Sequence, residues 1–178
     1  SNLAWKISHC LRKKHDDKLL NTYQSERSSN VKEYIETTMR MGEFVNAVGK
    51  SPITNNISAD SKGRKSMKSI KPRLGQGLGD LKDKFRGKIF PQFIIKKNKK
   101  LDEKFSLKPA LIISDEIKKN ISSKIKLIKS KNIKNLELFF KEHNCKAVIV
   151  RPDRFILSSC TSVKNFNSYL NKNLSLLA

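Results

Sequence analysis

The stretch of the sequence that comes nearest to a chemical motif is KPRLGQGLGD, residues 71–80, in which glycine recurs at every second position. Closely spaced glycines can let a backbone loop approach the phosphates of a nucleotide. A dinucleotide site also needs an apolar strand directly before the glycines and a helix after them. Here a run rich in Ser, Asn and Lys comes before them, and DLKDKFRGK follows. We therefore do not expect Gly75, Gly77 and Gly79 to bind a nucleotide.

Side chains that could serve as nucleophiles or metal ligands are few and scattered. His9, His15 and His143 share no helical spacing that would form a metal or catalytic cluster. The three cysteines lack CxxC spacing, so we expect small buried side chains in a reducing compartment: Cys10, Cys145 and Cys160. The sequence thus predicts no catalytic, cofactor-binding or metal-binding residue.

Arg27 is a further candidate because it lies on the apolar stripe of a long predicted helix. A guanidinium on an apolar face is costly unless a carboxylate pairs with it. Glu26, Glu33 or a carboxylate outside this sequence could do so. We interpret Arg27 as part of a structural ion pair rather than as a catalytic residue.

Two helices must carry these N-terminal residues. Leu3, Ile7 and Leu11 recur every four residues and predict an amphipathic helix, which Ser1 or Asn2 could cap or which could continue from a preceding segment. After the polar break HDDK, a second helical pattern spans residues 18–48. Its apolar stripe consists of Leu20, Tyr23, Val31, Tyr34, Thr38, Met41 and Val45. This stripe predicts a long antiparallel partner for the first helix.

The rest of the chain changes from a loose segment to an α/β pattern. Residues 49–70 are rich in Ser, Asn, Lys and Gly, which is typical of a linker. Apolar runs then predict strands at 109–114, 146–153 and 154–160, with helices at 135–144 and 163–177. The last two strands are joined too tightly for a crossover and should be antiparallel. We expect an α+β chain.

The formal net charge of +22 invites a nucleic-acid reading, which we do not favour. Lys, Asn and Ile are abundant together, as A/T-rich codons would produce. The basic residues are spread from Lys6 to Lys172, and runs such as 96–100 and 124–134 are not interleaved with aromatic residues. A basic nucleic-acid-binding protein and a helical interaction module remain the alternatives. No apolar run of about 20 residues and no signal sequence is present, so we expect a cytoplasmic protein without a membrane segment.

Several motifs together resemble one enzyme family. NLAWKI, at residues 2–7, and LLNTYQSER, at 19–27, are similar to a stretch of FAD-dependent aromatic-ring monooxygenases with the p-hydroxybenzoate hydroxylase fold. PRLGQGLG, GKIFPQ and KAVIVRPDRFIL resemble later segments of the subgroup that includes 3-(3-hydroxyphenyl)propionate hydroxylase and phenol hydroxylase. In that subgroup a thioredoxin-like domain follows the catalytic part.

The resemblance implies that this chain is the C-terminal portion of such a flavoprotein. Residues 1–48 would be a helical hairpin that ends the FAD-binding domain, 49–87 a linker and extended segment, and 88–178 a thioredoxin-like domain with a structural or dimer-contact role. The enzyme would reduce FAD with NADH or NADPH and hydroxylate a phenolic substrate. Its FAD fingerprint would lie before Ser1, so we expect the isolated chain to hold no FAD and to be inactive. Asn2 and Trp5 match the family motif, and we interpret both as helix packing residues.

Overall fold

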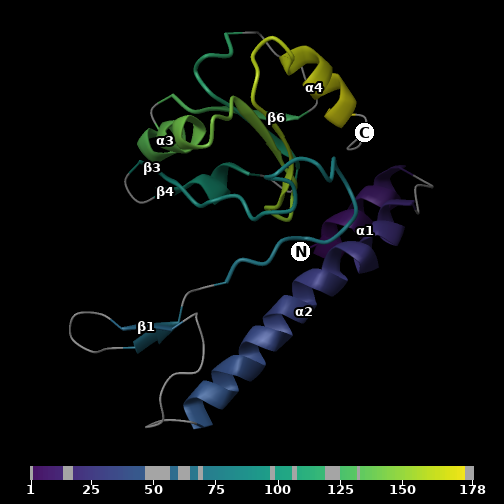
Figure 1. Cartoon of the computed structure of the whole chain (residues 1–178). Coiled ribbons are helices and arrows are strands. Elements are labelled where there is room, and N and C mark those ends of the chain that lie inside the picture. Colours follow the sequence, from purple (N-terminus) through teal and green to yellow (C-terminus); the bar gives the residue numbers. More distant parts are fainter. Residues whose placement is uncertain are drawn as a thin grey trace.

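The computed structural model describes residues 2–13, 18–46, 57–59, 65–67, 70–96, 99–105, 108–118, 125–131 and 133–174. Two helices come first, α1 (Asn2–Lys13) and α2 (Lys18–Asn46), and α1 packs beside the first part of α2 (Figure 1). The far part of α2 extends away from the rest of the molecule. The two predicted helices are therefore confirmed within the described residues.

A four-stranded sheet forms the body of the C-terminal half. Its order is β6 (Lys126–Lys129), β5 (Ala110–Ile113), β7 (Ala147–Val150) and β8 (Ile156–Cys160). β5 and β6 are parallel, whereas β5 pairs antiparallel with β7 and β7 with β8. The prediction of an antiparallel pair around residues 151–154 is confirmed, as is the α+β class.

One helix covers each face of this sheet (Figure 1). Successive residues of β5 point to opposite faces, so Ile112 packs with α3 (Lys134–Glu142) and Leu111 with α4 (Phe166–Leu174). Because both faces are covered, β5 and β7 are apolar and buried along their whole length. The predicted helices at 135–144 and 163–177 correspond to α3 and α4.

Some short elements were not predicted. β6 lies inside the basic run 124–134, for which no strand was predicted. Its end residues Lys126 and Lys129 are exposed at the edge of the sheet. Lysines at such an edge discourage pairing with another chain. β3 (Ile94–Lys96) and β4 (Lys99–Lys100) form an antiparallel pair followed by a 3-10 turn, Leu101–Lys104. Of the predicted linker at 49–70, the structure describes Ile70 and the antiparallel strands β1 (Ile57–Ala59) and β2 (Lys65–Met67).

Residues 70–90 lie between α2 and the sheet without a regular helix or strand and contain turns at residues 81–87 (Figure 1). Asn30 of α2 donates to the carbonyl of Pro72, and the Gly87 N–H donates to the carbonyl of Ile156 at 2.8 Å. Phe85 packs into the core beneath α3, so this core begins before residue 88, where we predicted the C-terminal domain to start. The segment therefore contacts both halves of the molecule.

The face that α2 buries differs from the predicted apolar stripe. Its buried residues are Leu19, Glu26 and Asn30, which lie at helical spacing on one side. Residues of the predicted stripe are exposed instead: Val31, Tyr34, Met41 and Val45. The predicted stripe is therefore not the face of α2 that packs against the rest of the protein, because the buried contacts of α2 are made largely by the polar residues Glu26 and Asn30.

Candidate functional site

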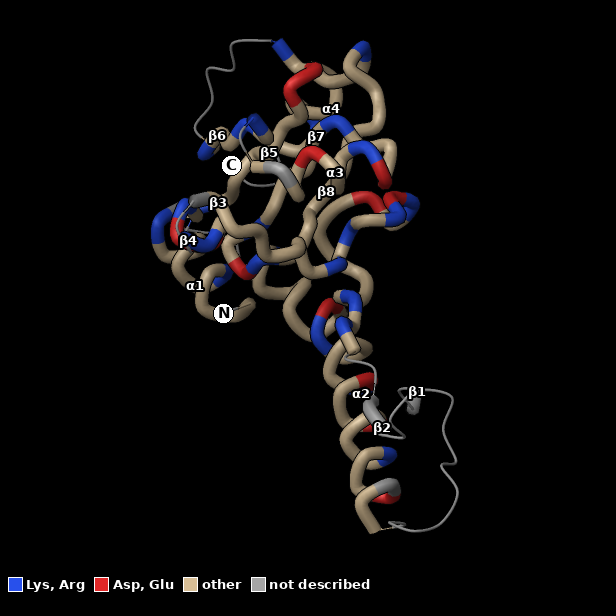
Figure 2. The backbone as a smooth tube through the Cα atoms, turned by 90° about the vertical axis from the view of Figure 1, so that its left-hand side faces the viewer, with Lys and Arg blue, Asp and Glu red and all other residues tan. Residues whose placement is uncertain are grey.

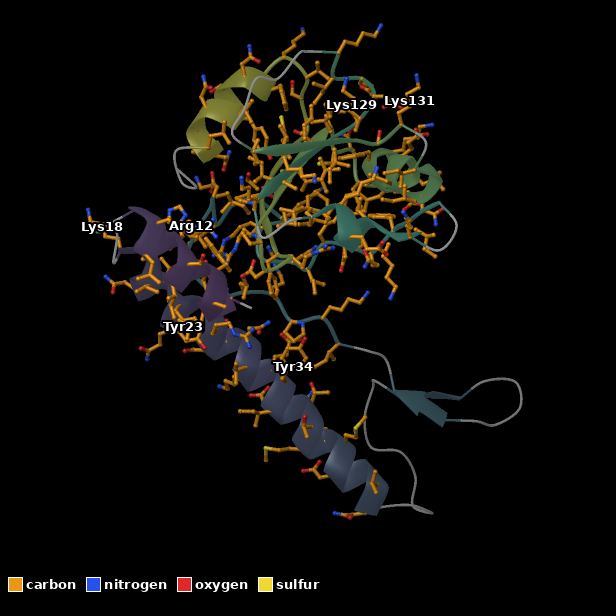
Figure 3. The ribbon with its side chains drawn as sticks, turned by 180° about the vertical axis from the view of Figure 1, so that it is seen from behind. Arg12, Lys18, Tyr23, Tyr34, Lys129 and Lys131 are labelled. Carbon is orange, nitrogen blue, oxygen red and sulfur yellow. The ribbon has the colours of Figure 1, made fainter. Side chains whose placement is uncertain are left out.

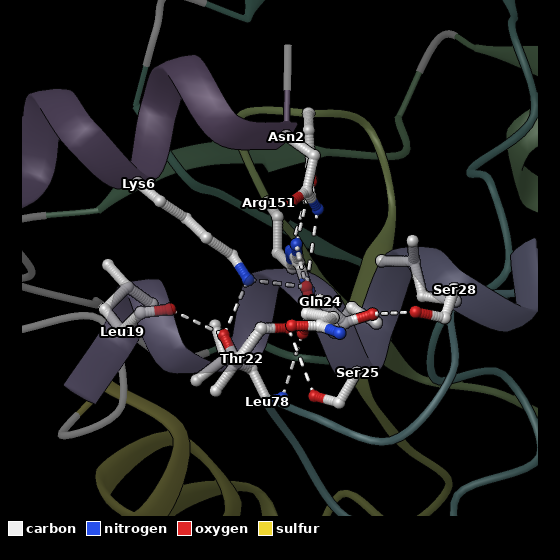
Figure 4. A network of polar contacts seen from close by, with 12 residues as sticks. Asn2, Lys6, Leu19, Thr22, Gln24, Ser25, Ser28, Leu78 and Arg151 are labelled. Atoms are coloured by element: carbon white, nitrogen blue, oxygen red, sulfur yellow. Dashed lines mark hydrogen bonds and ion pairs between the residues drawn. The ribbon is translucent and has the colours of Figure 1, made fainter. Parts of the chain in front are cut away.

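A buried cluster of polar side chains, four of them charged, lies where α1, α2 and the end of β7 meet. Its members are Asn2, Lys6, Glu26, Arg151 and Asp153, and all five are buried. Asn2 and Lys6 lie one turn apart on α1, Glu26 faces them from α2, and the other two follow β7 in the turn to β8. Figure 4 shows that Asn2, Lys6 and Arg151 point toward the same place.

Arg151 is the centre of the cluster. Its Nη1 and Nη2 donate to the two carboxylate oxygens of Glu26 at 2.8 and 2.9 Å. Its Nε and Nη2 also donate to the two oxygens of Asp153 at 3.1 and 2.7 Å. Two-pronged contacts of this kind fix both the position and the orientation of a guanidinium. Glu26 and Arg151, which are 125 residues apart in the chain, are thus held in one geometry.

α1 completes the cluster with one charged and one neutral side chain. The Lys6 ammonium lies 2.9 Å from Glu26 Oε2 and donates to the hydroxyl of Thr22 at 2.6 Å. The Asn2 amide donates to Asp153 at 2.7 Å and to Glu26 at 3.3 Å. Two cations therefore face two carboxylates, which balances the charge, as a buried ionic site requires.

The pKa values of these groups follow from burial and pairing. Burial of Glu26 acts to raise its pKa, but hydrogen bonds and charge from Arg151, with help from Lys6, outweigh burial and lower the pKa to about 2. Burial lowers the pKa of Lys6 despite its contact with Glu26. Burial also opposes the charge of Arg151, but its two carboxylate partners raise its pKa. Glu26 and Arg151 therefore remain ionised at neutral pH.

The glycines of the LGQGLG stretch make this cluster possible. A Cβ built on Gly75 would overlap the backbone oxygen of Ser25, and one on Gly77 would overlap the side chain of Glu26. With glycine at both positions the segment lies directly against α2, and the Leu78 N–H donates to Glu26 Oε1 at 3.0 Å. Gly79 has a φ of 90°, which a residue with a side chain rarely adopts. The close approach to α2 explains Gly75 and Gly77 without a bound phosphate.

Trp5 lies beside the cluster on α1. The guanidinium carbon of Arg151 is 5.1 Å from the centre of the Trp5 ring, within the range of a cation–π contact. The Trp5 ring is buried. On α1 itself it lies beside His9, with 6.4 Å between the two ring centres. Trp5 therefore packs against the residue that directly follows β7 as well as within the helical pair.

The cluster is suited to holding two parts of the molecule together rather than to catalysis. The Lys6 and Glu26 side chains are fully buried, and the hydrogen-bonding groups of Glu26 and Arg151 are used in contacts with each other and their neighbours. A general base needs access to a substrate proton, which this arrangement does not provide. The cluster therefore fixes α1 and α2 against the sheet.

The other candidates from the sequence lie apart from this cluster. Arg27 donates to Asn30 Oδ1, while the carboxylate of Glu26 faces Lys6 and Arg151. His143 packs edge-on against Phe139 at the end of α3, and His15 lies outside the described residues. Cys145 and Cys160 are buried and Cys10 is half-buried, and burial raises the pKa of the Cys145 thiol to about 11. In the described part of the chain, no group of three or more His, Cys, Asp or Glu side chains could hold a metal.

All five residues of the cluster lie within NLAWKI, LLNTYQSER and KAVIVRPDRFIL, but no sequence pattern assigns them to one site. A usable signal was Arg151, a charged residue directly after the apolar strand AVIV. A charge at the end of a buried strand requires a partner, and Asp153 two residues later supplies only one. The remaining partners come from α1 and α2, which no local pattern could indicate.

Basic residues are spread along the described chain. Figure 2 shows Lys and Arg on both halves of the molecule, with Asp and Glu among them. Lys129 and Lys131 lie on the sheet domain, whereas Tyr23 and Tyr34 lie along α2 (Figure 3). Arg12 and Lys18 lie on the helical hairpin with these tyrosines, so Lys129 and Lys131 are the labelled basic residues that lie apart from the labelled aromatic side chains.

No family model matches this chain, and no curated protein matches it either. Among the helices that the structure describes, none is long and apolar enough to cross a membrane.

Proposed function

We propose that this chain is the C-terminal part of an FAD-dependent aromatic-ring monooxygenase, in which the buried cluster joins the helical hairpin to the C-terminal domain. One observation carries the proposal. The resemblance to this family rests on five segments, and residues from four of them, NLAWK, YQSER, LGQGLG and VRPDR, meet at the cluster, whereas GKIFPQ lies outside it. Chance matches scattered over the chain would have no reason to converge on one buried site.

Two further features support this proposal. The C-terminal elements include, in order, the strand, helix, antiparallel pair and helix that the sequence predicted there, with the unpredicted strand β6 between β5 and α3. Large apolar side chains are also exposed on the hairpin: Leu3, Ile7 and Leu11 on α1, and Val31, Tyr34, Ile35, Met39, Met41 and Val45 on α2. In the proposed enzyme, this surface would contact the FAD-binding part.

The described residues themselves do not fit FAD. The only glycine-rich stretch among them packs so closely against α2 that a phosphate could not replace those contacts. FAD and NADH or NADPH would therefore be bound by a preceding part of the protein, and hydroxylation of a phenolic substrate would occur there. The residues of this chain would position that part through the helical hairpin, which Glu26 and Arg151 hold against the C-terminal half.

Two observations test the proposal: the sequence encoded in frame before Ser1, and the activity of the protein expressed from that longer reading frame. We expect an in-frame glycine-rich FAD fingerprint upstream. The protein expressed from the longer frame should be yellow and should oxidise NADH or NADPH faster when a phenolic acid is added. Residues 1–178 expressed alone should leave FAD fluorescence unchanged.

Three results would count against this proposal. A start codon beside Ser1, with no FAD fingerprint upstream, would refute the family assignment. Stoichiometric FAD binding by residues 1–178, with substrate-stimulated NAD(P)H oxidation, would instead refute the role as a scaffold. A protein that retains duplex DNA tightly at physiological salt would favour the nucleic-acid alternative.

A further inference from the structure

The two edges of the four-stranded sheet differ. The outer strands are β6 and β8. The edge of β8 is covered by the segment that precedes the sheet, because Ile156 exchanges backbone hydrogen bonds with Gly87 and Lys88. Farther along β8, the Ser159 N–H donates to the Asp83 carboxylate. In the part of the chain that the structure describes, β6 pairs with β5 alone. β6 is therefore the edge at which a further strand could pair.

Two residues of β6 direct their backbone groups away from β5. The N–H groups of Lys126 and Ser130 donate to carbonyls that belong to β5 or directly precede it. Successive residues of a strand point their N–H and C=O groups to opposite sides, so those of Leu127 and Lys129 face the outer edge. Among the described residues, no hydrogen bond uses these groups. An added strand would satisfy them, as when a peptide extends a sheet.

The side chains along this edge are basic. Lys126 and Lys129 are exposed, and Figure 2 shows basic residues at both ends of β6. Residues 117–136 contain neither Asp nor Glu. Lys126 shares a face of the strand with Ile128, which packs in the core under α3. Lys129 shares the opposite face with Leu127, which packs toward α4. One lysine therefore flanks the edge on each side of the sheet.

These charges decide which kind of strand can add to β6. A second copy of this chain would place lysine opposite lysine, and like charges in that position destabilise a strand pair. The formal net charge of +22 also opposes self-association. An extended segment with Asp or Glu is attracted instead, because its carboxylates come within reach of Lys126 and Lys129. The lysines thus disfavour a second copy and favour an acidic strand.

We propose that the edge of β6 binds an extended acidic segment of a partner protein, which adds a fifth strand to the sheet. The backbone groups of Leu127 and Lys129 provide the hydrogen bonds, and the side chains of Lys126 and Lys129 select the charge. Because these lysines lie three positions apart on opposite faces, the preferred segment carries two acidic residues with the same spacing. The site does not depend on the proposed flavoprotein function, because all of its groups belong to this chain.

Two peptides with the same sequence and charge distinguish strand addition from charge attraction. The first is a short peptide of Thr, Val and Glu, with two glutamates three positions apart. The second carries methyl groups on its central backbone nitrogens, so it cannot donate hydrogen bonds to β6. Their binding to residues 1–178 is measured by fluorescence anisotropy. We expect the methylated peptide to bind about tenfold more weakly, since each lost hydrogen bond costs about 0.5 to 1.5 kcal/mol.

Hydrogen exchange and charge-reversed variants locate the site. The amides of Leu127 and Lys129 should exchange more slowly when the first peptide is bound, whereas those of Lys126 and Ser130, already bonded within the sheet, should change little. Lys126→Glu combined with Lys129→Glu should weaken binding by about tenfold. Lys164→Glu is the matched control, because it reverses an exposed charge beyond the opposite edge strand, β8. The exchange data also show whether each variant is folded.

Three results would overturn the proposal. The first is failure of the acidic peptide to bind, or binding that leaves the exchange of Leu127 and Lys129 unchanged. The second is equal affinity for the two peptides, which would show attraction by charge alone. The third is a DNA oligonucleotide that binds as tightly as the first peptide and is weakened by the same charge reversals, which would make this edge a general site for polyanions.

Discussion

Replacing Glu26 with Gln should destabilise the protein strongly. Pairing lowers the Glu26 pKa from 4.5 to about 2, a difference that corresponds to about 3 kcal/mol of stability at neutral pH. The amide of Gln would keep the size of the side chain but would leave Lys6 and Arg151 buried with less negative charge. Removing one partner of a buried ion pair typically costs about 3 to 5 kcal/mol. We expect a loss within this range.

The assay is urea unfolding of residues 1–178, followed by the fluorescence of Trp5, which packs on Arg151. Because domains are stable by only about 5 to 15 kcal/mol, Glu26→Gln should shift the midpoint far toward low urea. Glu36→Gln on the same helix is the matched control. Its carboxylate is exposed and 3.9 Å from Lys32, so its loss should change stability by about 0.5 kcal/mol or less.

A double-mutant cycle separates the ion pair from other effects of the substitution. The second change is Arg151→Met. The double variant should be more stable than the sum of the two single losses predicts, because neither position then keeps a charge that has lost its partner at the other position. If Glu26→Gln cost no more than Glu36→Gln, or if the two changes were simply additive, the cluster would not hold the halves together as we infer.

Three other outcomes follow from the same geometry. The pKa of Glu26 is lower in the folded state than in the unfolded state. Its contribution to the free energy of unfolding is therefore complete above about pH 4.5 and is lost as the pH falls toward 2. Urea midpoints of the parent should decrease over this pH range, and those of Glu26→Gln should decrease less. Gly77→Ala should destabilise by about 2 kcal/mol or more because the added methyl overlaps Glu26, whereas Gly42→Ala, on an open helical position, should stabilise by up to about 1 kcal/mol. Cys145, buried and with a raised pKa, should react with a thiol reagent much more slowly than half-buried Cys10.

Each of these outcomes has a clear contrary result. An equal decrease of the midpoint with pH in the parent and in Glu26→Gln would mean that another carboxylate causes the acid sensitivity. Equal stability of the two glycine variants in urea would contradict the close approach of the segment to α2. Labelling of all three cysteines at one rate, followed by mass spectrometry, would contradict the burial of Cys145.

Most helices and strands could be predicted from the sequence alone because their signals are local. The four-residue recurrence of Leu3, Ile7 and Leu11 identified α1, and the apolar runs ALII and AVIV identified β5 and β7. The tight connection after Val150 also determined the antiparallel pairing with β8. β6 was missed because its lysines concealed a short edge strand, whose pairing with β5 depends on residues outside the run.

The buried face of α2 and the ionic cluster were decided only by the tertiary structure. Apolar spacing on α2 favoured the side with Tyr34 and Val45, yet the side with Glu26 is buried, because Arg151, Lys6 and the Leu78 N–H meet its carboxylate there. Whether a buried charge is tolerated depends on how many partners reach it, and those partners come from distant parts of the chain. The spacing of apolar residues describes one helix at a time. It therefore cannot show that the Glu26 carboxylate will pair with a guanidinium 125 residues farther along the chain.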